Sequence, residues 1–458
     1  MSHHSAPPKV AAVEIPKELS TFLGHIQNAF RSPFFRIYLP TTLCFLVINI
    51  MNSTILEFLW KHHLIYGADA DLLANFDKTI RFFLNPAKSL IFFLCTAVLI
   101  LPLGVFMAGQ ISRHLNWQQV RKTLLSLCFS FILISTIVPT GYGRSYARIS
   151  TDPFNQELSH LYRRLLVPGL ANIYHLDGFL YLFLFWAIVS LTVLSARIYF
   201  IRKNIDLTVL QEVSLLTCGI FASSFEFPGF PEVAVLLLAI IALIAYEEDG
   251  MFTATQLAAF SLALMAHEAC AIIVFVPMML ALFGRKSWLP SATVVLIYLI
   301  MLIANFSFNI LIPLDYQARV SDIPAPTFFL RSPAYVLLGA AFSFKLLWLF
   351  LPLAIYLLFK REKKTACFVL LSFAFALAST YIAVDYTRMV GFATVAMMVC
   401  FLTAHQRLSP RVFNGILAIN LLVPSFYAGS NSGLVTFRGL YYLVYKLIFT
   451  LPTPGVKF

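Results

Sequence analysis

The chain has 458 residues, of which 60% are hydrophobic and only 12% are charged, and its mean hydropathy is +0.82. A soluble domain is about 45–50% apolar and about 25% charged, so the composition excludes an ordinary soluble protein. The net charge of +12 is scattered over short segments between apolar runs. This distribution is typical of the positive-inside bias of membrane proteins, and no nucleic-acid partner is predicted.

Cysteine spacing excludes two further classes. The seven cysteines stand singly inside apolar runs, without a C-x-x-C pair, which indicates small core residues rather than a disulfide framework or a metal site. No metal-binding residues are therefore predicted, and a divalent metal ion stays open as a cofactor.

The chain begins with a polar to amphipathic segment, residues 1–36, which we expect on the cytoplasmic side. From Leu19 its apolar residues follow helical spacing, which fits a helix lying on the membrane or an ordinary helical extension. No cleavable signal peptide is visible, so the first span acts as the insertion signal. Residues 37–458 are predicted to form one polytopic membrane domain in contact with membrane lipids.

Apolar runs of about 20 residues recur along this domain, and that is the length with which an α-helix crosses the hydrocarbon core. The predicted fold is all-α, with about 11–14 transmembrane spans. The spans lie near 38–59, 88–109, 122–139, 178–200, 207–225, 230–246, 253–266, 269–284, 290–309, 334–359, 366–384, 390–404, 411–427 and 436–451. The pair between 253 and 284 is short, and short half-spans that meet at a polar turn are tolerated only inside protein.

Basic residues define the orientation of the spans. Compact basic segments are expected in the cytoplasm, and residues 247–249 fall on the same side although they are acidic. The basic segments are 113–122, 197–203, 285–286, 360–364 and 407–411. The opposite, extracytoplasmic side then receives 60–87, 140–177, 226–232, 267–268, 310–333, 385–389 and 428–435. Because the unusual polar groups gather on that side, we expect a site there.

The segment 140–177 is the longest polar interruption with the character of a site, and we expect amphipathic helices in it. Asp152 is a candidate general base toward a hydroxyl acceptor, or the start of a helix with Pro153 at its first position. Arg163 and Arg164 suit the binding of a lipid phosphate. The alternative for each arginine is an extended side chain that reaches the headgroups.

Two further carboxylates are candidate catalytic groups. Glu232 follows a Phe-Pro-Gly-Phe-Pro turn at the outer side, and Glu268 interrupts an apolar stretch together with His267. Ionisable residues inside spans are costly and suggest function, while a buried, paired Glu268 is the structural alternative. The sequence H-E-A-C-A lacks the second histidine of a zinc protease. His267 is a candidate substrate-binding residue.

Three charged residues in the C-terminal half complete the candidate binding set. Asp385 and Arg388 end a span on the outer side and, three residues apart, are also placed to pair with each other. Lys345 lies about three turns inside its span, where it either contacts a lipid phosphate or extends along a groove toward the surface.

At these residues the chain resembles bacterial integral-membrane glycosyltransferases of the GT-C architecture, which are mannosyltransferase-like. Members carry a loop G-Y-D-G-Q-x-Y-Y-x-x-A-x-D-P-F and a following R-R-x-L-x-P-x-L-A. Here GY at 141–142 and STDPF at 150–154 match the ends of the loop, and YRRLLVPGLA at 162–171 matches the second motif. PE at 231–232 resembles the acidic start of a later span, and AHEA at 266–269 stands where members show R-E-T.

The resemblance implies transfer of a sugar from a polyprenyl-phosphate donor to a glycan, lipid or protein acceptor at the outer face of the bacterial inner membrane. One departure concerns the base, because Gly143 and Arg144 occupy the place of the family's first aspartate. Either Asp152 or Glu232 has taken that role, or the activity is changed or lost.

Other classes fit the sequence less closely. A transporter or flippase of a lipid-linked or small polar solute would place ionisable groups near the bilayer midplane and use broken helices. A surface-polysaccharide polymerase or ligase would rely on an arginine-rich late loop, whereas 310–333 holds only Arg319 and Arg331. A non-catalytic descendant remains a further alternative, and no oligomeric state is predicted.

Overall fold

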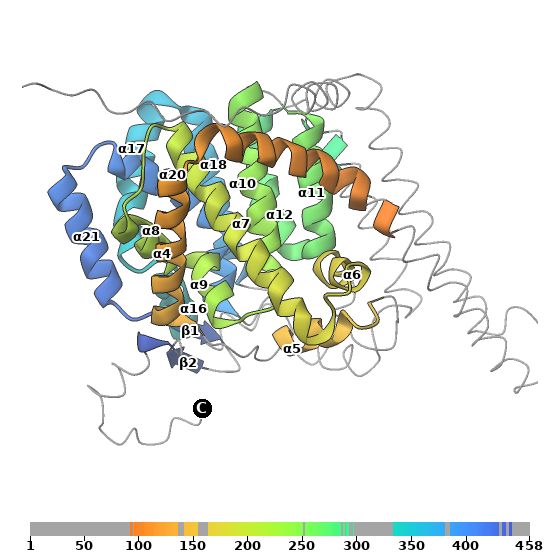
Figure 1. Cartoon of the computed structure of the whole chain (residues 1–458). Helices are drawn as coiled ribbons and strands as arrows, with labels where there is room; N and C mark the ends of the chain where they lie inside the picture. The colour runs from red at the N-terminus through yellow and green to blue at the C-terminus, as the bar shows by residue number, and fades with distance from the viewer. Residues whose placement is uncertain are drawn as a thin grey trace, which may run out of the picture.

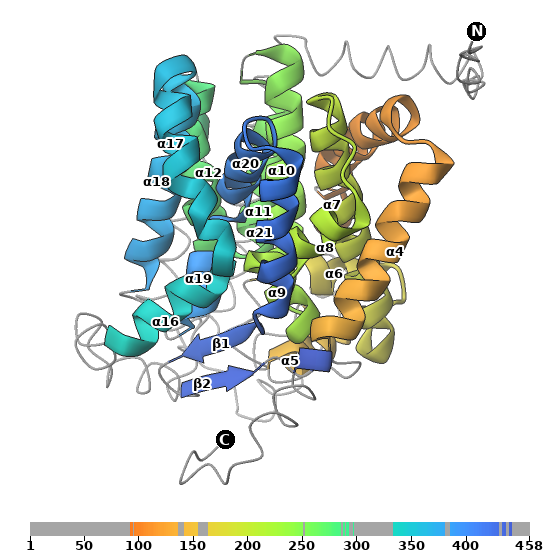
Figure 2. The same cartoon turned by 90° about the vertical axis from the view of Figure 1, so that its left-hand side faces the viewer.

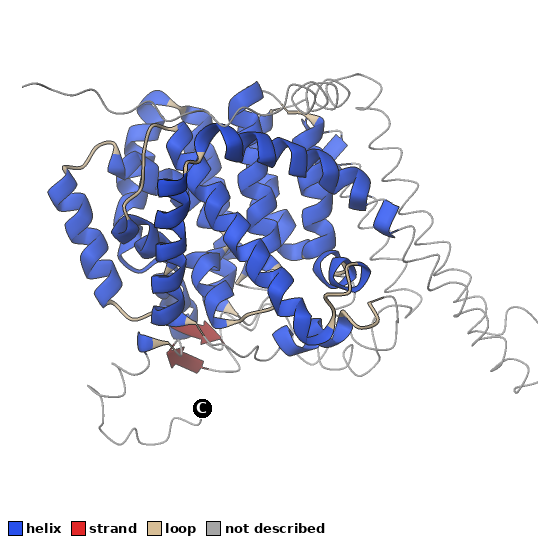
Figure 3. Cartoon of the chain, in the orientation of Figure 1, coloured by secondary structure: helices blue, strands red, loops and turns tan. Residues whose placement is uncertain are grey.

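A bundle of helices forms the part of the chain that a computed structural model describes, residues 92–94, 96–135, 142–153, 164–250, 252–284, 287–288, 290–292, 296, 333–380, 385–429, 433–436 and 439–441. Figure 3 shows that the described elements are helical except for two short strands. The all-α class is confirmed in this form. The predicted segment 1–36, the span near 38–59, Arg163 and residues 310–332 of the late loop lie outside the described residues.

The helices and strands follow one another in a simple order (Figures 1 and 2). They are a helix at Phe92–His114, α4 (Trp117–Ile134), α5 (Tyr142–Ile149), α6 (Leu166–Ile173), η2 (Gly178–Leu180), α7 (Tyr181–Arg202), α8 (Val209–Leu216), α9 (Gly219–Glu226), α10 (Glu232–Asp249), α11 (Ala254–Ala266), α12 (Glu268–Met278), η3 (Met279–Phe283), α16 (Pro333–Phe344), η4 (Lys345–Leu349), α17 (Phe350–Arg361), α18 (Lys363–Ser379), α19 (Tyr386–Gly391), α20 (Thr394–His405), α21 (Pro410–Leu422), β1 (Phe426–Gly429) and β2 (Gly433–Thr436).

Three of these helical segments are long and apolar enough to cross a membrane: Phe92–His114, Gly178–Arg202 and Pro333–Arg361. Each coincides with a span predicted from the sequence. The central helix α10 is buried along most of its length and packs against α7, α11, α12 and α20. Its apolar residues therefore contact protein on all sides, which is the pattern of a helix inside a bundle.

Polar caps fix where several helices begin. Asn116 and Gln119 form a reciprocal capping box at the start of α4, and Thr208 and Gln211 do so at the start of α8. Such boxes satisfy two backbone N–H groups that would otherwise lack partners. The local sequence therefore determines where these two helices begin.

Ion pairs join the predicted cytoplasmic segments at one end of the bundle. Lys203 Nζ lies 2.7 Å from Glu247 Oε1, and Arg113 Nη1 lies 3.5 Å from Glu248 Oε1. The acidic residues 247–249, which share a side with the basic segments in the sequence analysis, thus neutralise some of those basic groups. The buried guanidinium of Arg197 extends this network through Glu212 Oε2 at 2.5 Å.

The predicted loop 140–177 carries two short helices, as expected. Helix α5 is amphipathic and α6 is mostly buried. In both views α5 lies at the same end of the bundle as β1 and β2 (Figures 1 and 2). The two strands pair antiparallel, with Tyr427 opposite Val435.

The spans predicted near 207–225, 334–359 and 390–404 are each interrupted, which corrects the sequence analysis, and the first two breaks have a common feature. The span near 207–225 is broken between α8 and α9 at Cys218, and the span near 334–359 is broken at Lys345, where a 3₁₀ turn begins. Both breaks contain positive backbone angles, with φ of 58° at Gly219 and 49° at Lys345. The unbroken apolar runs predict continuous helices, but contacts with other helices interrupt them at these two positions.

Close backbone contact explains the break before α9. Gly219 lies against Gly391, which ends α19, and the Ile220 N–H donates a hydrogen bond of 2.9 Å to Thr394 Oγ1. A Cβ at Gly219 would come within 2.2 Å of that oxygen and 2.8 Å of the Phe344 ring. Only glycine combines this conformation with this space.

We therefore predict that Gly219→Ala lowers the free energy of unfolding by at least about 2 kcal/mol, through backbone strain and overpacking. Gly109→Ala is the matched control, because its Cβ would meet no atom within 4 Å and alanine favours a helix by up to about 1 kcal/mol. Thermal unfolding of the detergent-solubilised protein measures both. Equal melting temperatures for Gly219→Ala and the parent would contradict the close contact at Gly219.

Candidate functional site

A buried cluster of charged side chains lies at the end of the bundle opposite the basic segments. Arg388 Nη1 lies 3.4 Å from Glu232 Oε1, and His267 Nε2 lies 3.5 Å from the same oxygen. Arg388 also pairs with Asp385. Four of the residues predicted from the sequence, Glu232, His267, Asp385 and Arg388, are thus brought together from α10, the α11–α12 turn and α19.

The turn before α10 places Glu232. Glu232 is the first residue of α10 after Pro231, so its carboxylate lies at the positive end of the helix dipole. Gly229 (φ 100°) makes the preceding turn, and a Cβ there would come within 3.0 Å of Gly143 Cα. Gly143 of the 140–177 loop therefore lies against the turn that leads into Glu232.

His267 occupies the point where α11 ends and α12 begins. Its backbone is extended (φ −163°), and its Nδ1 accepts a hydrogen bond of 3.4 Å from the Cys270 N–H. An accepting Nδ1 leaves the ring proton on Nε2, the atom that faces Glu232. The two short helices predicted between 253 and 284 therefore form a hairpin whose polar turn reaches the cluster.

Arg388 is held on several sides. Its guanidinium carbon lies 4.8 Å from the centre of the Phe230 ring, a cation–π contact. Burial lowers the pKa of Arg388, but Asp385 and Glu232 raise it by more, so the pKa is raised overall. Arg388 is therefore a permanent cation between two carboxylates.

Tyr427 is the member of the cluster that the sequence analysis missed. Tyr427 lies on strand β1, and its hydroxyl group forms a hydrogen bond with the Asp385 carboxylate. The neighbouring Ala428 N–H donates a hydrogen bond of 2.8 Å to Thr387 Oγ1. These two hydrogen bonds attach the β1–β2 hairpin to the first turn of α19. The only signal in the sequence is the polar, glycine-containing stretch that ends the span near 411–427.

The carboxylate of Glu232 keeps unused hydrogen-bonding capacity. Its side chain is 3% exposed, and within the described part of the chain neither oxygen has a hydrogen bond. Oε1 lies 3.4 Å from Arg388 Nη1 in an ion pair and 3.5 Å from His267 Nε2, and neither contact is a hydrogen bond. Buried polar groups are nearly always hydrogen-bonded, so this carboxylate is a candidate to accept a proton, or a hydrogen bond from a hydroxyl group, of a ligand.

A second cation approaches the cluster from the 140–177 loop. Arg164 Nη1 donates 2.7 Å to the Tyr146 hydroxyl, and the Tyr146 ring meets Phe230 edge-on with centroids 6.1 Å apart. Arg164 is near enough to Arg388 to interact with it electrostatically. Helices α5 and α6 therefore bring the loop motif and the Glu232 cluster together.

The remaining predicted site residues lie elsewhere. Asp152 follows α5, half-buried, with its N–H donating 3.1 Å to the Ile149 carbonyl, and no contact in the described structure links it to Glu232. Glu268 begins α12, but its side chain lies outside the described residues. Among the described residues, no group of three or more His, Cys, Asp and Glu side chains is placed to hold a metal ion.

Lys345 is buried apart from the cluster. Its Nζ donates hydrogen bonds to the Val423 carbonyl at 3.2 Å, to Ser425 Oγ at 3.2 Å and to Thr217 Oγ1 at 3.5 Å. The residue is 7% exposed. Lys345 thus joins the break between α16 and η4 to the segment before β1, and its side chain does not extend to a surface.

Comparisons of the chain with family models, with curated proteins and with solved structures find no match. The class that the described geometry defines is accordingly a helical bundle with three helices able to cross a membrane and a buried Glu–His–Arg–Asp cluster at one end.

We predict that Arg388→Gln lowers the free energy of unfolding by about 3–5 kcal/mol, because it leaves two carboxylates without their cation. Glu232→Gln removes one of these charges, so the double variant Glu232→Gln/Arg388→Gln should lose less than the sum of the single changes, by at least about 1 kcal/mol. A double-mutant cycle of unfolding in detergent measures the coupling. Additive effects would show that the two residues do not interact.

Proposed function

We propose that the protein is a multi-pass membrane glycosyltransferase that moves a sugar from a polyprenyl-phosphate donor to a glycan, lipid or protein acceptor. The observation that carries the proposal is the buried Glu232 carboxylate, which has no hydrogen bond within the described structure and faces a permanent cation, Arg388. A base beside a cation is the pair of groups that such a transfer requires.

Each member of the cluster has a role in this proposal. Glu232 takes the proton of the acceptor hydroxyl as its oxygen attacks the anomeric carbon, and the bond from that carbon to the phosphate oxygen breaks. Polyprenyl phosphate leaves with the bonding electrons, and Arg388 and Arg164 stabilise the negative charge on it. His267 holds the Glu232 carboxylate in position, and Tyr427 holds Asp385 against Arg388.

Support for Glu232 as the base comes from its position in the fold. Gly143, where the glycosyltransferases that the sequence resembles carry their first aspartate, packs against Gly229, three residues before Glu232. In this proposal Glu232, from the adjoining turn, takes the role that the loop aspartate has in the glycosyltransferases that the sequence resembles. Asp152, the alternative base, lies outside the described cluster.

The sidedness of the proposal follows from charge. The ion pairs of Lys203 with Glu247 and of Arg113 with Glu248 mark one end of the bundle, and basic segments favour the cytoplasm. The Glu232 cluster at the other end then lies at the outer face of the bacterial inner membrane, where lipid-linked sugars meet their acceptors.

A transporter or flippase is the second candidate, and the helix breaks at Gly219 and Lys345 favour it. Discontinuous helices mark the substrate sites of many secondary transporters. In this chain, however, the Lys345 ammonium is already bound by Val423, Ser425 and Thr217, whereas the Glu232 carboxylate has acceptor capacity left. The transferase therefore remains the first proposal.

Donor turnover tests this proposal. Purified protein in lipid vesicles is offered a panel of polyprenyl-phosphate sugars together with a membrane extract as the source of acceptor, and released polyprenyl phosphate is measured. We expect Glu232→Gln to reduce release at least about 100-fold, the lower range for a lost general base, while donor binding persists. Glu248→Gln, the same substitution at the opposite end, is the matched control and should keep full turnover.

The two candidate functions give different outcomes. If no donor on the panel binds, the transferase proposal fails. Release that survives Glu232→Gln but is lost in Asp152→Asn would transfer the role of base to Asp152. Solute or lipid flux through the vesicles without any release of polyprenyl phosphate would favour the transporter.

A further inference from the structure

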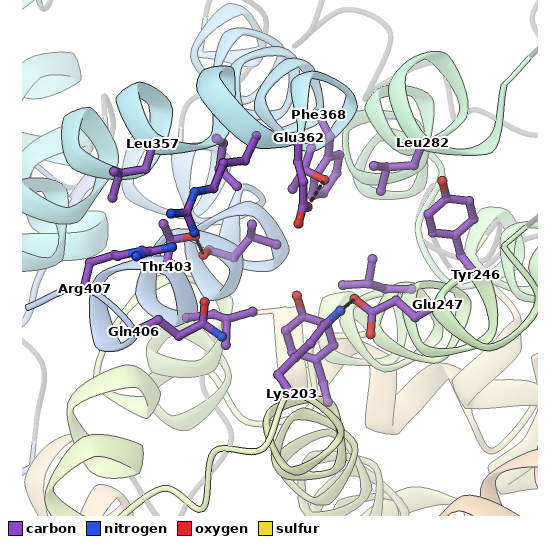
Figure 4. Close-up of a pocket in the computed structure, with 17 residues that line it drawn as sticks. Lys203, Tyr246, Glu247, Leu282, Leu357, Glu362, Phe368, Thr403, Gln406 and Arg407 are labelled. Atoms are coloured by element: carbon purple, nitrogen blue, oxygen red, sulfur yellow. Dashed lines mark hydrogen bonds and ion pairs between the residues drawn. The ribbon is translucent and has the colours of Figure 1, made fainter.

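A second site-like feature lies at the opposite end of the bundle from Glu232. There the described residues line a hollow of about 170 Å³, shown in Figure 4. It lies between the ends of α7, α10, α17 and α20 and the start of α18. Glu247, one of its lining residues, is 15 residues along α10 from Glu232, so about 22 Å separates the two sites at 1.5 Å per residue.

The hollow has an acidic and a basic side. Figure 4 shows Glu247 and Arg407 on opposite sides of it, with Glu362 between them along the upper edge. Arg361 also lines it. Glu247 and Glu362 thus line parts of this space away from Arg407, and Lys203 lies beside Glu247.

The basic side has donors to offer a ligand. Arg361 and Arg407 are exposed, and in the described part of the chain neither side chain has an ion-pair or hydrogen-bond partner. Arg361 ends α17 and Arg407 lies two residues beyond α20, positions where cations stabilise the terminal carbonyl groups of a helix. Two forked guanidinium groups at one space also match the geometry of a phosphate.

The acidic side is incompletely neutralised. Glu247 pairs with Lys203 at 2.7 Å, and Glu362 accepts a hydrogen bond of 3.0 Å from Thr365 Oγ1. Burial raises the pKa of Glu247 above its ordinary value even though Lys203 lowers it, and the charge of Glu362 adds to the increase. A cation bound in the hollow, in addition to Lys203, would compensate the negative charge of both carboxylates.

We propose that this hollow binds a small zwitterion that carries a phosphate and an ammonium group, with the phosphate at Arg361 and Arg407 and the ammonium at Glu247 and Glu362. The volume supports a compact ligand, since a cavity of about 150 Å³ holds a molecule of the size of benzene. The binding is separate from any transfer at Glu232 and does not depend on the transferase proposal.

The same chemistry occurs in a free phosphoethanolamine and in the headgroup of a lipid. The apolar residues Leu357 and Leu358 line the hollow, and the exposed Tyr356 and Phe359 lie on the same helix, α17. An acyl chain attached to the headgroup therefore has an apolar surface beside the hollow. The experiment below separates these two sources.

Binding of O-phosphoethanolamine to the purified full-length protein, measured by calorimetry in detergent, is the first arm. The second uses nanodiscs with and without phosphatidylethanolamine and follows the melting temperature. We expect Arg407→Gln and Glu362→Gln each to weaken the soluble zwitterion at least about tenfold, one charged contact in each case. Arg411→Gln, an exposed arginine that does not line the hollow, is the matched control and should bind as the parent does.

Inorganic phosphate and ethanolamine are offered alone as the two halves of the ligand, and each should bind at least about tenfold more weakly than the zwitterion. Inorganic phosphate that binds as tightly as the zwitterion would overturn the proposal, as would equal losses in Arg411→Gln and Arg407→Gln. Should Arg407→Gln fail to fold, Arg361→Gln replaces it. Stabilisation only in nanodiscs assigns the site to the lipid headgroup, binding of the soluble zwitterion alone assigns it to a free solute, and failure of both arms refutes it.

Discussion

One cation between two carboxylates is the constraint on which the Glu232 end of the bundle depends. Removing Arg388 and Glu232 from water costs several kcal/mol for each ion, and only close pairing offsets that cost. The pairing requires α10, α19 and the α11–α12 turn to meet at one point, and β1 closes the group through Tyr427. The architecture of this end is thus the set of helix positions that keeps the charges together.

The two ends of the bundle use charge in different ways. At the basic end, both partly exposed pairs such as Lys203 with Glu247 and the buried pair of Arg197 with Glu212 are satisfied within the protein. At the other end the charges are buried, and Glu232 retains unused acceptor capacity. The first arrangement favours orientation in a membrane, while the second favours chemistry on a ligand.

Much of the candidate site could be predicted from the sequence, because charges inside apolar runs are costly and therefore conspicuous. Orientation by basic segments placed Glu232, His267 and Arg388 on one side, and the fold brings them into contact. Tyr427 could not be predicted, since its role depends on a strand pairing that an apolar pattern does not encode. The breaks at Gly219 and Lys345 were missed because they arise from contacts with distant helices, whereas local apolar patterns predict continuous ones.

The most direct test of the central claim is an experimental structure of the protein in nanodiscs with a polyprenyl-phosphate sugar bound. The account predicts the donor phosphate in contact with Arg388 and Arg164, and the anomeric carbon within reach of a hydroxyl group that bonds to Glu232. A donor seated beside Lys345, or at the end of the bundle that holds Glu247, would contradict it. In that case the Glu232 cluster would be a structural tie between helices.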